Sequence, residues 1–279
     1  MKDIGIYINS SGRAKLVHAV KKFPQEWKKF TQIIVPFKQK KEYENSLDWP
    51  IIGLPKEIPS FLAPQRKWVC DNSRHQFIFT IDDDVLFEKR DKLLKLRKAT
   101  YDEMNEMLEL IYKEVKEKKI PQVGISTRLG NNRVEEDYED IARATRAYCY
   151  NREIILREKI NFSPFNELVM DDFHITLCLL KKGYLNRIYY SFAQSDFGSN
   201  TEGGCSLYRN FEVMKKNTQF MLHEHRGFVK IKMKKTKNSW EGFPRDENGN
   251  YIRIDLIIFW KKAYQSFLDK KMGISHFFK

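Results

Sequence analysis

Runs of apolar residues alternate with polar and charged stretches along the first half of the chain. Four of these runs are short and rich in aromatic and β-branched residues, as is typical of β-strands, and they cover residues 4–9, 32–37, 76–81 and 122–127. Helical or irregular stretches separate them, which favours a parallel sheet with helices on its faces. No internal repeat is visible. The pattern predicts an α/β fold with a nucleotide-binding layout.

Helical periodicity is clearest over residues 100–119. Apolar side chains recur there at helical spacing beside a charged face, namely Met104, Met107, Leu108, Ile111, Tyr112 and Val115. We interpret the methionines as core residues and not as a cofactor site. A shorter helix is predicted over residues 15–22. The turn Ser10-Ser11-Gly12-Arg13 that precedes it can receive an anion on its backbone N–H groups, although it is no full phosphate-binding loop.

Three carboxylates, Asp82-Asp83-Asp84, directly follow the apolar run 77–81. A buried strand that ends in like charges predicts a site at the carboxyl edge of the sheet. Adjacent carboxylates repel one another, so we expect a cation between them. The first and third carboxylates can both reach one hard divalent ion, which would then hold the phosphates of a nucleotide. The alternative is a polar strand exit, in which one aspartate caps the next helix and the others are solvated.

A second acidic pair, Asp171-Asp172, precedes the apolar helical segment 175–182. Acidic residues at the start of this segment, lysines at its end and Gly183 just beyond are a helix signature. The pair is therefore interpreted either as a helix cap or as a rigidly held carboxylate that serves as general base at a cleft.

Histidines and cysteines give weaker signals. His174 lies close to the second acidic pair, and we interpret it as structural. One histidine of the triplet His223-Glu224-His225 is a candidate to complete the mixed oxygen and nitrogen shell of a metal ion held by the aspartates. The four cysteines are scattered with no pair at zinc-ligand spacing, and we predict reduced core or edge residues at Cys70, Cys149, Cys178 and Cys205.

Composition predicts a globular chain. With 279 residues, 42% of them hydrophobic, the chain can bury the core of one sizeable α/β domain or two small ones. No apolar run is long enough to span a bilayer, and the N-terminus enters a strand-like segment without signal-peptide architecture. We therefore expect a cytoplasmic protein without a membrane partner.

The formal net charge of +13 favours a polyanionic partner, nucleic acid or a phosphorylated ligand. A lysine-rich composition encoded by an AT-rich genome is the alternative explanation. A local cluster is more informative, because lysines 230, 232, 234, 235 and 237 interleave with Ile231, Met233 and, further on, Trp240. This arrangement suits a groove that follows a nucleic-acid backbone, and it also fits a half-exposed strand.

Four motifs in order carry a family resemblance. They are 79–84, 170–174 followed by Leu-Leu-Lys-Lys-Gly-Tyr, 198–200 continuing through 203–209, and Trp-Lys-Lys-Ala-Tyr at 260–264. The set resembles the TET-associated glycosyltransferases of phages and their relatives, to which the kinetoplastid glucosyltransferases that make base J are similar. The resemblance covers most of the chain.

This resemblance implies a GT-A fold, with a Rossmann-like, mostly parallel central sheet flanked by helices, in one catalytic domain over residues 1–279. A nucleotide-sugar-binding half would cover about 1–130 and an acceptor-binding half about 131–279. The implied reaction uses Mn²⁺ or Mg²⁺ and moves a sugar, with glucose the expected one, from a UDP-sugar to hydroxymethylcytosine or hydroxymethyluracil in double-stranded DNA. The location would be the host cytoplasm if a phage encodes the chain.

The resemblance also implies residue roles. Asp82 and Asp84 would bind the metal and diphosphate, and Asp83 would contact the sugar or ribose. The later acidic motif of the family falls on Asp171 and Asp172 and makes both of them candidate catalytic residues. Asp171 stands where the family commonly has Glu, and it would reach the donor sugar. The C-terminal histidine that ligates the metal in many GT-A enzymes would be His225, or His223 if the alignment shifts.

Sugar transfer from a diphosphate needs the leaving group neutralised and the acceptor hydroxyl deprotonated. Arg13 and Arg66 are candidate diphosphate or nucleotide contacts, and Asp172 would be the general base of an inverting displacement. If the reaction instead retains the configuration of the transferred sugar, Asp172 has another role. The alternatives are a nucleotidyl- or phosphotransferase, a DNA-binding module, and a GT-A enzyme acting on protein or polysaccharide.

Overall fold

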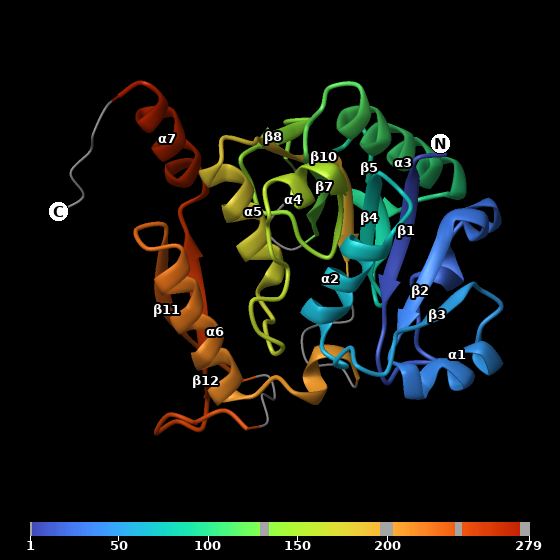
Figure 1. The fold of residues 1–279 in the computed structure, drawn as a ribbon, viewed down its shortest axis with the longest axis horizontal. Coiled ribbons are helices and arrows are strands. Elements are labelled where there is room, and N and C mark those ends of the chain that lie inside the picture. The colour runs from blue at the N-terminus through green and yellow to red at the C-terminus, as the bar shows by residue number, and fades with distance from the viewer. Residues whose placement is uncertain (1, 129–133, 196–202, 238–241, 274–279) are drawn as a thin grey trace.

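A ten-stranded sheet organises the part of the chain that the computed structural model describes, residues 2–128, 134–195, 203–237 and 242–273 (Figure 1). Its strand order is β3-β2-β1-β4-β9-β7-β10-β5-β6, with β8 also paired to β10. The strands are β1 (Ile4–Asn9), β2 (Thr31–Val35), β3 (Ile51–Gly53), β4 (Phe77–Asp82), β5 (Leu86–Arg90), β6 (Leu96–Lys98), β7 (Gln122–Thr127), β8 (Tyr138–Asp140), β9 (Ala147–Asn151) and β10 (Asn186–Ser195).

Most of these strands run in one direction, which confirms the mostly parallel α/β sheet. Strands β3, β2, β1 and β4 pair in parallel, as do β7 and β10, whereas β9, β5 and β8 run the opposite way. The register of β1 and β4 sets Asn9 opposite Asp82. The ends of two neighbouring parallel strands therefore meet where the first acidic motif begins.

The four predicted strands are confirmed as β1, β2, β4 and β7. Strand β2 ends at Val35, before Pro36, because proline has no backbone N–H for the sheet ladder. The lysine cluster after residue 229 is a strand, as one of its two interpretations required. Part of the 198–209 motif (198–200) and Trp240 lie outside the described residues.

The predicted helix over residues 15–22 is wrong, because that segment is irregular except for the short 3-10 helix η1 (Val20–Lys22). Ala14, Val17, Ala19 and Val20 are all buried, and such spacing does not lie on one helical face. The backbone N–H of Ala19 instead donates to the carbonyl of Asp83 at 3.1 Å. Contact with the loop after β4 thus replaces the local helical hydrogen bonds.

Helices cover both faces of the sheet, and their residues divide between two apolar clusters. One cluster contains the buried apolar side chains of α3 (Tyr101–Lys116), and the other contains part of those of α2 (Leu62–Asn72), α4 (Arg152–Arg157) and α5 (Asp171–Lys181). Helix α3 confirms the prediction for residues 100–119, and Thr100 caps it in a capping box with Glu103. Its methionines Met104 and Met107 are buried in the core.

The remaining short helices lie in connecting segments. They are α1 (Lys40–Ser46) and the 3-10 helices η2 (Gln25–Phe30), η3 (Phe37–Gln39) and η4 (Gly204–Leu207). None of the helices in the described ranges is both long and apolar enough to cross a membrane.

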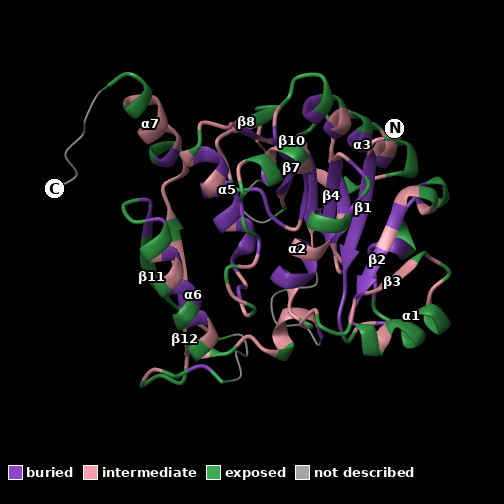
Figure 2. Cartoon of the chain, viewed as in Figure 1, coloured by how far each residue is buried: buried purple, intermediate pink, exposed green. Residues whose placement is uncertain are grey.

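A smaller unit follows the main sheet and stands beside it in Figure 1. It comprises α6 (Phe211–Glu224), the hairpin of β11 (Val229–Thr236) and β12 (Tyr251–Ile258), and α7 (Trp260–Lys271). A third apolar cluster joins it to α5 through Leu177, Met221 and Ala263. Much of the hairpin stays exposed, as Figure 2 shows. We call α6, β11, β12 and α7 the C-terminal module.

Candidate active site

The first acidic motif lies at the end of β4 in a polar pocket of about 120 Å³. Asp82 is the last residue of the strand, and Asp83 and Asp84 follow in a turn that leads to β5. The next element after the triplet is strand β5 and not a helix, so the helix-cap interpretation is wrong. The pocket is also lined from the end of β1 and the loop after it, by Asn9, Ser10, Ser11 and Arg13.

Asp83 is bound by protein groups on both of its oxygens. It accepts hydrogen bonds from the Ser10 hydroxyl at 2.5 Å and from Arg13 Nη1 at 2.6 Å. The same Arg13 nitrogen lies 3.2 Å from Asp84. Burial raises the pKa of Asp83, while Arg13 and Ser10 act to lower it. Arg13 therefore joins the predicted site as the cation beside Asp83 and Asp84.

Arg66 connects the two acidic motifs. Its guanidinium donates to Asp82 at 2.5 Å and to Asp171 at 2.7 Å, and only 4% of the residue is exposed. Burial raises the pKa of Asp82 to about 6, although the charge of Arg66 opposes that shift. Burial likewise raises the pKa of Asp171, against the same arginine. Both terminal nitrogens of Arg66 are thus engaged by carboxylates of the protein.

The second acidic motif lies in the first turn of α5, where Met170 is the N-cap residue and makes no side-chain cap. Neither aspartate occupies the cap position. Asp172 accepts from the backbone N–H of Phe173 at 2.9 Å, and its other oxygen lies 3.3 Å from Arg143. Asp172 lines a second pocket, of about 360 Å³. A carboxylate held in this way at a cavity suits a general base.

The two pockets adjoin at Asp82. Both are lined by Asp82, Leu62, Arg146, Cys205 and Arg209, so the carboxyl edge of the sheet and the start of α5 border one continuous space. The second pocket is also lined by Lys234 and Arg253 of the hairpin. The pair of pockets therefore has acidic groups at its base and basic groups from several separate segments around it.

Several buried polar atoms of the described residues near this space have no hydrogen-bond partner within the protein. They include Asn9 Oδ1, Arg66 Nε and the hydroxyl of Tyr148. Asn9 lines the first pocket. Tyr148 is fully buried in β9, and burial raises the pKa of its hydroxyl against the opposing charge of Arg66. Such atoms are expected where a site binds polar molecules.

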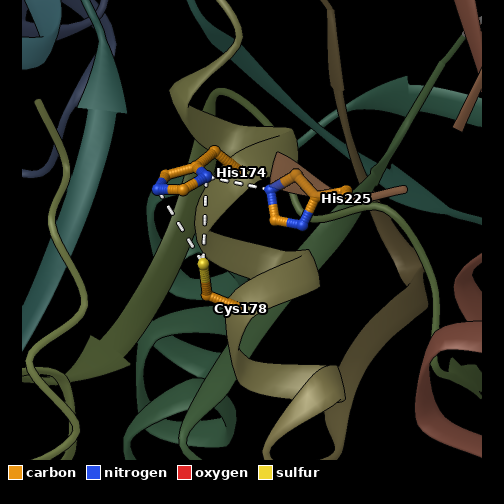
Figure 3. A group of neighbouring side chains, drawn as sticks. All are labelled: His174, Cys178 and His225. Atoms are coloured by element: carbon orange, nitrogen blue, oxygen red, sulfur yellow. Dashed lines mark hydrogen bonds between the residues drawn. The ribbon is translucent and has the colours of Figure 1, made fainter. Parts of the chain in front are cut away.

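His225 is separated from the aspartates. It is buried at the end of α6, where its Nε2 lies 2.9 Å from Nδ1 of His174 and its Nδ1 lies 3.4 Å from Lys181 (Figure 3). Neither pocket that the aspartates line includes His225. The structure therefore does not bring His225 into the predicted set with Asp82 and Asp84, and we leave it out of the cation site. His223 lies in the last turn of α6.

Residues that sequence reasoning did not identify contribute much of the lining. Arg143, Arg146 and Gln65 come from loops or helices with no motif of their own. Tyr43 was missed as well, although its hydroxyl lies 2.8 Å from Ser10 and accepts from the Arg13 backbone N–H. The turn of residues 10–13 was the one signal that pointed to this part of the site.

The first pocket fits a hard divalent cation. Asp82 and Asp84 supply carboxylate oxygens to the lining of this pocket. The Asp82 side chain is 28% exposed and the Asp84 side chain is 16% exposed. Mg²⁺ and Mn²⁺ prefer carboxylates combined with substrate phosphates and water. These two residues would hold such an ion, whose chemistry is to neutralise the charge of a leaving diphosphate.

Comparison with known proteins gives a family and a fold. The family model of the TET-Associated Glycosyltransferase matches residues 4–204. The crystal structure of S. aureus TarS 1-349 in complex with UDP-GlcNAc is similar over 98% of this chain and 73% of that chain, with a TM-score of 0.52 at 11% identity. The UDP complex of the same protein gives 0.46 at 11% identity, over 98% and 72% of the two chains. A search of curated proteins gives no match. The GT-A type of α/β fold is confirmed.

Proposed function

Because this chain belongs to the TET-associated glycosyltransferase family and is therefore a glycosyltransferase, we propose that it moves a sugar from a UDP-sugar to a 5-hydroxymethylpyrimidine in DNA. One observation carries the proposal: Arg66 binds Asp82, which lines both pockets, and Asp171, which lines the second. A donor site and an acceptor site for the same reaction must adjoin in this way.

The first pocket is the proposed donor site. A bound cation on Asp82 and Asp84 would neutralise the diphosphate, and Arg13 would add a fixed positive charge beside it. The family resemblance gives Asp83 a sugar or ribose contact, whereas its oxygens here accept from Ser10 and Arg13. We therefore propose that Asp83 orients Arg13. The fold shared with TarS, whose crystal structure contains UDP-GlcNAc, supports a UDP-sugar as donor.

The second pocket is the proposed acceptor site. Asp172 would take the proton of the hydroxymethyl group as its oxygen attacks the sugar, which is the role of the base in an inverting displacement. Asp171 would position the start of α5 through its contact with Arg66. The donor half would then comprise about residues 1–130 and the acceptor half about 131–279, although β9 of the second half pairs between β4 and β7 of the first.

Basic residues support DNA as the acceptor. Arg143, Arg146, Arg209, Lys234 and Arg253 line the second pocket. Lys234 alternates along β11 with Lys232 and Lys230, and alternate residues of a strand share one face. Asp255 lies opposite Lys232 on this face and pairs with Lys234, so the lysines leave a net positive charge that continues outward from the pocket, as a protein that follows a phosphate backbone requires.

The proposed reaction is tested by incubating the protein with duplexes that contain hydroxymethylcytosine or hydroxymethyluracil, a panel of UDP-sugars including UDP-glucose, and Mn²⁺ or Mg²⁺. Nucleoside mass spectrometry should show a mass gain equal to one sugar. Duplexes with 5-methylcytosine are the matched control, because they lack the attacking hydroxyl. Release of UDP without any change in DNA would be consistent with a glycosyltransferase and would exclude DNA as the acceptor.

The cation site is tested by Asp84→Asn. This change keeps the shape of the side chain and removes one charged oxygen ligand, so Mn²⁺ affinity should fall at least about 10–100-fold, the loss typical even of groups that only support a metal ligand. Isothermal titration with Mn²⁺ and UDP measures it. Asp91→Asn, in the exposed turn between β5 and β6, is the control. Unchanged affinity would exclude Asp84 as a ligand.

The DNA surface is tested by Lys232→Gln. Affinity for duplex DNA should fall, and the slope of log K against log salt should decrease by about 1, if Lys232 contacts one phosphate. Lys41→Gln on α1, which contacts the edge strand β3 of the large sheet, should change neither value. Fluorescence anisotropy over a salt series measures both. Wild-type binding that does not depend on salt would contradict a phosphate contact surface.

A further inference from the structure

Three metal-binding side chains meet where α5 contacts the C-terminal module. His174 and Cys178 lie one helical turn apart on α5, and His225 follows α6 (Figure 3). One ligand atom from each lies within 4.8 Å of the other two. This group is separate from the two pockets described above, and it places Cys178 at a cluster that its isolated position in the sequence did not predict.

We propose that His174, Cys178 and His225 bind one Zn²⁺ ion, through Nδ1, Sγ and Nε2 respectively, with a water molecule as the fourth ligand. Two imidazoles and a thiolate are ligands that zinc prefers over Mg²⁺ or Mn²⁺. The site is independent of the donor cation and of the proposed reaction.

The three ligand atoms lie within reach of one ion, although not yet in tetrahedral positions. Bond lengths of about 2.0–2.1 Å for Zn–N and about 2.3 Å for Zn–S place two nitrogens roughly 3.4 Å apart and a nitrogen and a sulfur roughly 3.6 Å apart. His174 Nδ1 lies 3.8 Å from Cys178 Sγ and 2.9 Å from His225 Nε2. Cys178 Sγ is equally far, 3.8 Å, from His174 Nε2, so the thiol lies beside the imidazole and must rotate toward Nδ1 to bind the ion.

The surroundings of His174 orient it for metal binding. Its Nε2 lies 3.1 Å from the backbone carbonyl oxygen of Asn161, which accepts only, so the ring proton is on Nε2 and the lone pair of Nδ1 faces the cluster. Metal-binding histidines commonly donate their other N–H to such a carbonyl. Burial lowers the pKa of His174 to about 4 and that of His225 to about 2, so both rings are neutral at neutral pH.

Lys181 is the group that opposes the ion. Its ammonium donates to the Glu224 carbonyl at 3.0 Å and lies 3.4 Å from His225 Nδ1. Without metal, a lysine donor at Nδ1 leaves the His225 proton on Nε2, which donates to His174. With zinc on Nε2, that proton moves to Nδ1 and Lys181 keeps the Glu224 carbonyl. The Cys178 thiol loses its proton to solvent, so binding releases one proton.

The position of the site suggests what the ion does. Helix α5 begins with Asp171 and Asp172, whereas His225 stands just before β11 and lies beyond residues 4–204 that match the family model. An ion bound by all three side chains would fasten the C-terminal module, with its basic hairpin, to the helix that carries the proposed base. Zinc should therefore raise the melting temperature of the protein.

Cobalt titration of the metal-free wild type, followed by zinc competition, tests the site. We expect one Co²⁺ per chain with the charge-transfer absorption of a Co–thiolate bond, and displacement by Zn²⁺. Cys178→Ser should abolish that absorption and weaken zinc binding at least about 100-fold, the upper end of the loss seen for groups that only support a ligand. Cys70→Ser changes a buried cysteine outside this cluster and is the control for folding. This variant should keep both the Co–thiolate absorption and the zinc affinity.

Two further variants make the result specific. Lys181→Gln should strengthen zinc binding, by about tenfold or more, because it removes a positive charge close to the ion. Asp84→Asn should leave zinc binding unchanged, so failure of the donor cation site and failure of this site are distinguishable. A wild-type protein that binds no Co²⁺ with thiolate absorption, or a Cys178→Ser variant that retains it, would overturn the proposal.

Discussion

Asp172→Asn should stop sugar transfer and leave UDP-sugar affinity nearly unchanged. The amide keeps the size of the side chain but cannot accept a proton from the attacking hydroxyl, and loss of a general base lowers turnover by about 10²–10⁴-fold. Asp172 lines the second pocket, away from the Asp83 and Asp84 side of the donor pocket. The change should therefore appear in kcat and not in the dissociation constant of the donor.

Single-turnover transfer and equilibrium titration with the UDP-sugar separate these two quantities. Asp171→Asn is an informative comparison, because Asp171 is fully buried against Arg66 and its loss should reduce stability as well as activity. Asp172→Asn, in contrast, should leave the melting temperature close to that of the wild type. Normal turnover by the Asp172→Asn protein would exclude Asp172 as the base.

The strands that carry the site were predictable from the sequence because their apolar runs are buried on both faces. In β1 and β4, nearly every residue is buried, so continuous aromatic and β-branched runs are the only pattern that fits. The carboxylates at the end of β4 stand out against such a run. For the same reason Asp82, Asp83 and Asp84 could be placed at the carboxyl edge of the sheet from the sequence alone.

The helix predicted over residues 15–22 shows where this reasoning fails. Lysines and apolar residues in that segment match a helical pattern, but Val17, Ala19 and Val20 are all buried, and these positions do not share one helical face. The Ala19 N–H bonds to a carbonyl that is distant in sequence. Periodicity describes one buried face, and it cannot represent a segment enclosed from several sides.

The partners of the charged residues could not be predicted either. Arg66 was a candidate for diphosphate binding, and its burial between Asp82 and Asp171 depends on how α2, β4 and α5 meet. His225 was expected near the aspartates, yet it packs against His174 because the end of α6 lies against α5. Spacing along the chain gives no information about contacts between segments that are about 50 residues apart, as these two histidines are.

Arg66→Met should destabilise the protein strongly, by about 3–5 kcal/mol, because removal of one partner leaves buried carboxylates uncompensated. Arg66 is 4% exposed, and it binds both Asp82 and Asp171. Methionine is flexible and fills most of the same volume, so the loss reports charge more than packing. Chemical denaturation without added metal measures the free energy of unfolding.

The loss of stability in Arg66→Met should also depend on pH. Burial already raises the pKa of Asp82 to about 6 and raises that of Asp171, and without Arg66 both would rise further. A carboxyl group whose pKa is higher in the folded state than in the unfolded state stabilises the fold below its unfolded pKa and loses that contribution as pH rises through the folded pKa. The free energy of unfolding of the variant should therefore be closest to the wild-type value near about pH 4. Above about pH 6 it should be lower than the wild-type value.

Arg157→Met is the matched control, because Arg157 forms an exposed pair with Glu158 and such pairs contribute about 0–1 kcal/mol. A second variant, Arg66→Met with Asp171→Asn, removes one of the two uncompensated charges and should recover part of the lost stability. If Arg66→Met unfolds no more easily than Arg157→Met at neutral pH, the arginine does not hold the two acidic motifs together. The donor and acceptor pockets would then be joined by apolar packing alone.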